Sequence, residues 1–163
     1  ERITTMTTRT MTSLIAALGL ALASGPAAAR SAQALFIESP SKYGFAESVK
    51  RLQAAAKKGG WKIPKVFNLQ GAMKKAGHKV RPVTVVAVCK PALAVKILGN
   101  DARRAAAAMM PCKVAVYEKA DGTTYFSRVN AAALRKSAPG GAGAAMVEAG
   151  EGLEQLLAGL IKK

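Results

Sequence analysis

The sequence predicts an α+β domain in which one antiparallel or mixed sheet is covered by helices on one face. Two observations carry this prediction. Short β-branched runs alternate with helical apolar periodicities, and the turn signal Asp121-Gly122 joins two of the runs into a hairpin ahead of a closing helix. Half of the 163 residues are hydrophobic and 21% are charged, which excludes a largely disordered chain. The length suits one domain with an appendage.

The appendage comes first, because residues 1–30 have the pattern of a cleaved signal peptide. Arg9 precedes an apolar run over residues 14–23, and small residues follow it up to Ala29. The run is about ten residues long, whereas a transmembrane helix needs roughly 20, so a retained helix is the weaker alternative. We therefore expect residues 31–163 to form a single domain that a bacterium exports, either to the periplasm or outside the cell.

The first half of that domain has a β-α-β pattern followed by a short helix. Its segments are an apolar run over 34–39, a helical periodicity over 45–56, and a strand pattern over 61–67. Pro40 closes the first strand, and Gly59-Gly60 ends the helix. Asn68 suits the N-cap of the short helix, which Gly77 terminates.

The second half predicts a buried strand, short helices, the hairpin and the closing helix. These elements span 83–88 for the strand, 91–98 and 101–110 for short helices, 113–118 and 123–129 for the hairpin, and 146–160 for the last helix. The run over 83–88 is almost wholly apolar, which predicts a central strand covered on both faces. Glu148, Glu151 and Glu154 recur opposite the apolar stripe of the closing helix, so they predict a solvated face.

Three stretches also carry a family resemblance by their order and spacing. They are Phe45-Ala46-Glu47, Cys89-Lys90-Pro91, and the run from Met110 to Glu118 that contains Pro111-Cys112. Over roughly residues 36–160 the chain resembles the family called domain of unknown function 302. The resemblance implies a β-α-β unit, further strands and a closing helix, often as a homodimer. It implies no reaction and no catalytic residue, and it places Cys89 and Cys112 where the family pattern has them.

The two cysteines are the candidate site. If 83–88 and 113–118 are antiparallel neighbours, Cys89 and Cys112 come to one edge of the sheet. They could then form a structural disulfide, a soft-metal site suited to Cu(I) with Met109 or Met110 as auxiliary donor, or a thiol redox pair. Free cysteines that pack as small buried hydrophobes are the simpler interpretation. The Cys-x-x-Cys pair typical of thiol oxidoreductases does not occur in the sequence.

The sequence offers little for catalysis. His78 is the single histidine, and the Ser-His-Asp, HExxH, Walker and GxGxxG patterns do not occur. General acid–base or nucleophilic chemistry needs a positioned proton donor or nucleophile, for which only the cysteines are candidates. We therefore expect a binding or accessory protein rather than an enzyme.

The charge predicts a second kind of function. The formal net charge is +16, and residues 42–81 hold eleven Lys or Arg against one acidic residue, Glu47. Such a field favours an anionic partner or membrane surface. The candidate contacts are basic side chains of this region, namely Lys50, Arg51, Lys57, Lys58, Lys74 and Lys75. Few aromatic residues accompany them and the domain is expected to be exported, which argues against nucleic acid. Lysines spread over solvated faces for solubility are the alternative.

Overall fold

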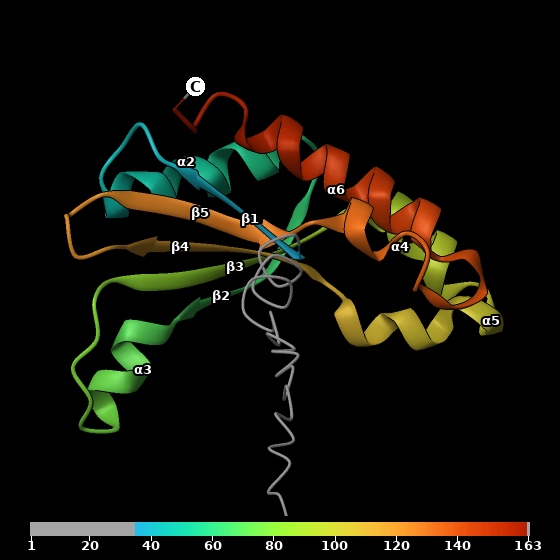
Figure 1. The fold of residues 1–163 in the computed structure, drawn as a ribbon, viewed down its shortest axis with the longest axis horizontal. Helices are drawn as coiled ribbons and strands as arrows, with labels where there is room; N and C mark the ends of the chain where they lie inside the picture. The colour runs from blue at the N-terminus through green and yellow to red at the C-terminus, as the bar shows by residue number, and fades with distance from the viewer. Residues whose placement is uncertain (1–34, 163) are drawn as a thin grey trace, which may run out of the picture.

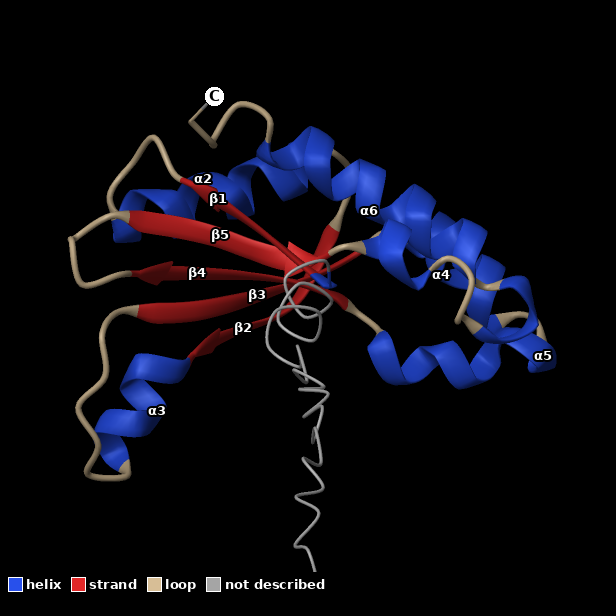
Figure 2. Ribbon diagram, in the orientation of Figure 1, coloured by secondary structure: helices blue, strands red, loops and turns tan. Residues whose placement is uncertain are grey.

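A computed structural model describes residues 35–162, and within them five strands form one sheet (Figure 1, Figure 2). The strand order is β1-β5-β4-β3-β2, and all neighbouring strands are antiparallel. The predicted α+β class is confirmed. The expected signal peptide, residues 1–30, lies outside the described residues. None of the helices within residues 35–162 has the length and apolar character needed to cross a bilayer.

The elements follow the predicted order. Their bounds are β1 Phe36–Pro40, α2 Phe45–Lys58, β2 Lys62–Asn68, α3 Leu69–Lys75, β3 Val83–Cys89, α4 Pro91–Leu98, α5 Asp101–Arg104, η1 Ala105–Met109, β4 Cys112–Glu118, β5 Thr124–Val129, η2 Ala131–Leu134, η3 Pro139–Gly141 and α6 Gly143–Leu157, where η marks a 3₁₀ helix.

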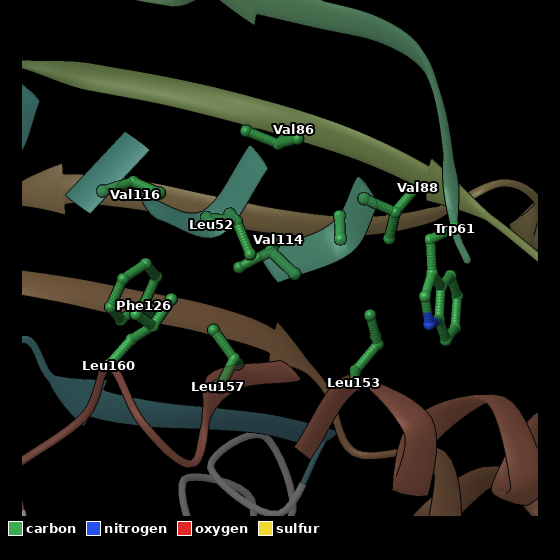
Figure 3. Close-up of a cluster of buried hydrophobic side chains, with 11 residues drawn as sticks. Leu52, Trp61, Val86, Val88, Val114, Val116, Phe126, Leu153, Leu157 and Leu160 are labelled. Carbon is green, nitrogen blue, oxygen red and sulfur yellow. The ribbon is translucent and has the colours of Figure 1, made fainter. Parts of the chain in front are cut away.

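Helices α2 and α6 cover one face of the sheet and enclose the main core (Figure 3). Alternate residues of a strand point to the same face, so β3, β4 and β5 each contribute every second side chain. The sheet residues of this core are Val86, Val88, Val114, Val116 and Phe126. Leu52 of α2 and Leu157 of α6 meet them, and both are fully buried. On the opposite face of β3, Ala87 is buried but Val83 and Val85 are only half-buried, so the expected cover on both faces is partial.

Helix α6 approaches the core closely because small residues face it. A Cβ added to Gly152 would lie 2.8 Å from Cζ2 of Trp61, whose side chain is 4% exposed. A separation this short has no room for a methyl group, so the glycine lets the helix rest on the indole ring.

Glu154 on the predicted solvated face of α6 is 43% exposed, and it also pairs with the sheet. Its carboxylate accepts hydrogen bonds from Nε of Arg128, at 2.8 Å, and from Nη2. Arg128 lies on β5 under the helix, with 3% of its side chain exposed, and its Nη1 also donates to Oγ of Ser39 at 2.8 Å. Because a buried guanidinium needs a counter-charge, the helix supplies one on this side. The exposed Glu148 also has a partner, Lys96 of α4, at 2.6 Å.

Beyond the strand ends, a second and smaller apolar cluster joins α4, η1 and α6, on the right in Figure 1. Ile97 of α4, Ala106 of η1 and Ala145 of α6 are its buried members within these helices, and Met110 and Met146 pack against it. The main core and this cluster meet at the ends of β3 and β4, where the two cysteines lie.

Candidate functional site: a sulfur-lined cavity

Cys89 is the last residue of β3, and Cys112 is the first residue of β4. The two strands are antiparallel neighbours, and Cys112 is opposite Val88, one residue before Cys89. The expected meeting of the cysteines at one edge of the sheet is therefore seen. Both thiols are free, so the two cysteines do not form a disulfide in this structure.

A cavity of about 130 Å³ opens beside the cysteines. Its walls come from the ends of β3, β4 and β5 and from α4, η1, η2 and α6, and most of the side chains in them are apolar. Leu93, Ile97, Leu134 and Leu153 are among these. This volume is below the roughly 300–1,000 Å³ of a pocket for a drug-sized ligand. The cavity therefore suits an ion or a very small molecule.

Sulfur is concentrated in the wall of this cavity. It is lined by Cys89, Cys112, Met109, Met110 and Met146. Among the described residues these are both cysteines and three of the four methionines, and only Met73 lies elsewhere. Met146 was missed as a candidate in the sequence, because its place in the apolar stripe of the closing helix is equally typical of core packing.

Met109 and Met110 both reach the cavity although they are adjacent. Met109 is the last residue of η1, and Met110 leaves the helix with an extended backbone, at φ −95° and ψ 154°. The chain turns there before Pro111 and Cys112, so helical spacing does not separate the two side chains. Met109 is 44% exposed and lies at the outer side of the site, whereas Met110 is partly buried.

Burial raises the pKa of the Cys112 thiol above its ordinary value of 9.0, and the neighbouring Cys89 raises it further. The Cys112 backbone amide and the charge of Lys113 oppose this shift. A thiol with a raised pKa is protonated at neutral pH and is a weak nucleophile. A bound cation would supply the charge that stabilises its thiolate.

Two lysines add positive charge at the cavity. Lys90 follows Cys89 and Lys113 follows Cys112, and both line the wall while remaining exposed. Within residues 35–162, no three His, Cys, Asp or Glu side chains gather in a way that could hold a metal ion. Any metal at this cavity would therefore use the two thiolates together with methionine sulfur.

The basic residues predicted to contact an anionic partner do not form one patch. Four of them lie on α2, namely Lys50, Arg51, Lys57 and Lys58, and two lie on α3, namely Lys74 and Lys75. Figure 1 shows α2 packed along the sheet and α3 projecting beyond β2, away from α2. Arg51 is also engaged locally, since Nε lies 2.7 Å from Oε1 of Glu47 and its guanidinium stacks over Tyr43.

Comparison with known proteins agrees with this architecture. A crystal structure of an uncharacterized conserved protein, DUF302, from Bacillus stearothermophilus has a TM-score of 0.68 at 19% identity, and the match covers 76% of this chain and 96% of that chain. At this identity the likeness shows the fold. No curated protein matches the sequence. The family described as "Domain of unknown function DUF302" matches residues 37–160, so this chain belongs to the DUF302 family.

Proposed function

We propose that this protein is a small exported accessory protein that binds Cu(I) through Cys89 and Cys112. One observation carries the proposal: both cysteines and three of the four described methionines line one small cavity. Thiolate and thioether sulfur are the soft ligands that select Cu(I) over the hard cations. Methionine sulfur is neutral, so it can complete the coordination without adding charge to an apolar site.

The charge of a Cu(I) complex can be offset at this site. Two thiolates and one Cu(I) carry a net charge of −1, which the lysines beside them, Lys90 and Lys113, can offset at the cavity wall. A divalent ion with hard-ligand preferences would need oxygen donors. Only two of the lining side chains are charged, and both are cationic.

The raised pKa of Cys112 favours metal binding over thiol redox chemistry, the other use of the cysteines. Redox-active cysteines attack as thiolates, and their environments lower the pKa. Here burial has the opposite effect. Metal binding overcomes the same burial, because the cation displaces the proton and pairs with the thiolate within the cavity.

The test is a competition titration of the reduced full chain with Cu(I) and a chromogenic Cu(I) chelator, without oxygen. We expect the wild-type protein to take Cu(I) from the chelator and the C89S/C112S variant to fail. The variant M73L removes the one described methionine outside the cavity and should leave the affinity unchanged. Equal affinity of the wild type and C89S/C112S would overturn the proposal, provided both unfold at the same temperature.

A separate variant tests Met109 and Met110 as auxiliary donors. We expect M109L/M110L to weaken Cu(I) binding by about tenfold, as the loss of a supporting ligand typically does, because leucine preserves the packing but removes sulfur. If M109L/M110L binds like the wild type, Met146 or the two thiolates alone complete the site, and the proposed role of Met109 and Met110 is wrong.

Export is supported by the signal-peptide pattern of residues 1–30. A fusion of residues 1–34 to a reporter enzyme that is active only after export should give activity. A fusion that stays inactive in the cytoplasm would contradict this part of the proposal. The expected homodimer stays a prediction.

A further inference from the structure

Residues 69–81 leave the sheet as an arm between β2 and β3. The chain runs from the end of β2 through α3 and returns to β3, and Figure 1 shows this segment at the lower left, projecting beyond the sheet. Apart from Gln70 and Gly71, every residue of the arm is exposed, and α3 has no buried residue. We call residues 69–81 the α3 arm.

The α3 arm exposes three large apolar side chains. Of the nine that the described residues expose, Leu69, Met73 and Val80 lie on the arm, and Val66 and Phe67 lie beside it on β2. Leu69 and Met73 are four residues apart, so they lie on the same face of α3 one turn from each other. A cluster of exposed apolar side chains of this kind marks a contact surface, whereas single ones are ordinary.

The charged residues around these apolar side chains are all basic. The arm holds four basic residues, namely Lys74, Lys75, Lys79 and Arg81. Between Glu47 and Asp101 the sequence contains no acidic residue. The arm therefore presents an apolar surface interleaved with uncompensated positive charge.

Local hydrogen bonds fix the shape of the arm. Asn68 caps α3, where its Oδ1 accepts the backbone N–H of Gly71 at 2.8 Å. Nε2 of Gln70 donates to the carbonyl of Val80 at 3.2 Å and joins the helix to the returning chain. Gly77 has φ +83°, a left-handed conformation that favours glycine, and it reverses the chain after the helix. The arm thus has a defined structure, on which Leu69, Met73 and Val80 remain partly exposed.

From this combination we infer that the α3 arm docks on an anionic membrane surface. Basic side chains attract anionic headgroups, while Leu69 and Met73 can enter the boundary between headgroups and acyl chains. A polyanion that binds through charge alone would gain nothing from these apolar side chains. The inference is independent of the sulfur cavity and uses none of its residues.

The experiment measures partitioning of the full chain onto vesicles of phosphatidylcholine with or without phosphatidylglycerol. Each Lys or Arg near an anionic surface strengthens binding by roughly fivefold, so K74Q/K75Q should lower the affinity for anionic vesicles by roughly 25-fold. The matched control K57Q/K58Q removes the same charge from the exposed end of α2 and should change the affinity for anionic vesicles little. All variants share residues 1–34, so any contribution of that segment cancels in the comparison.

Two further variants test insertion. L69S/M73S keeps every charge and should weaken binding to anionic vesicles by at least tenfold, because apolar burial supplies part of the affinity. M73W places a tryptophan on the arm, and its emission should shift to shorter wavelength with anionic vesicles. The native Trp61 is 4% exposed in the core and contributes a constant background.

Three results would overturn the inference. Binding lowered equally by K57Q/K58Q and K74Q/K75Q would show that net charge alone is responsible. Full binding by L69S/M73S together with an unshifted M73W spectrum would show a purely electrostatic contact, of the kind an acidic partner makes. Equal partitioning of the wild type onto vesicles with and without phosphatidylglycerol would exclude recognition of anionic lipid.

Discussion

The pair formed by Arg128 and Glu154 offers a quantitative test of how α6 is held on the sheet. The two side chains differ in exposure, at 3% for Arg128 and 43% for Glu154. This asymmetry predicts that the two single substitutions have unequal costs. E154Q leaves the guanidinium charge buried without a counter-charge, whereas R128M removes the buried charge and leaves a carboxylate that water can reach.

The magnitudes follow from that difference. Removing one partner of a buried pair costs about 3–5 kcal/mol, and the partial exposure of Glu154 places E154Q near 3 kcal/mol. A methionine at position 128 fills similar space and should cost about 1 kcal/mol, because a buried pair replaced by apolar side chains is often close to neutral. Once R128M has removed the buried guanidinium, E154Q leaves no charge unpaired, so it should then change the free energy of unfolding little. The coupling energy is then about 2–3 kcal/mol.

The assay is equilibrium unfolding in urea, followed by the fluorescence of Trp61, the sole tryptophan of the chain, which the core buries. The four proteins of the cycle should share one m-value, so that shifts in midpoint report stability alone. If R128M costs as much as E154Q, or if E154Q costs the same in both backgrounds, the argument from unequal burial is wrong.

Two other predictions concern close packing and the site. G152A should destabilise the fold by about 1–3 kcal/mol in the same urea assay, because its methyl group would collide with Trp61. The control G159A places a methyl group in open space, so its stability should stay within about 0.5 kcal/mol of the wild type. Burial disfavours the Cys112 thiolate, so the pH midpoint for alkylation of Cys112, measured by peptide mass spectrometry, should lie above 9.0. C89S should lower this midpoint, because the Cys89 charge contributes to the raised pKa of Cys112. A midpoint at or below 9.0 in the wild type would contradict this account.

Local patterns in the sequence predicted most of the elements, because their causes are local. Asp121-Gly122 lies in the turn between β4 and β5, and the Oδ1 of Asn68 caps α3 as expected. The partial cover of β3 was not predictable in this way, since a β-branched run fits a strand with one or two covered faces. Val85 and Val86 differ in burial because α2 and α6 pack on the face of Val86.

Pairing between distant segments explains what the sequence could not predict. Glu154 is predicted as solvated from its own helix, and its partner Arg128 stands 26 residues earlier, on a strand that α6 covers. The cavity is a similar case. The meeting of Cys89 and Cys112 follows once β3 and β4 are paired, whereas the place of Met146 depends on how α6 crosses the strand ends.

The two proposed sites lie at opposite ends of β3, and this separation has a functional consequence. The α3 arm ends just before Val83, and Cys89 closes the strand at the cavity. Seven residues of extended chain span roughly 20 Å, which exceeds the depth of about 5–10 Å to which an interfacial segment enters a membrane. An arm docked on lipid therefore leaves the sulfur cavity in water, open to a donor or acceptor of the metal. Cu(I) affinity should accordingly be the same with and without anionic vesicles, and a change would mean that the arm and cavity are coupled or that lipid reaches the thiols.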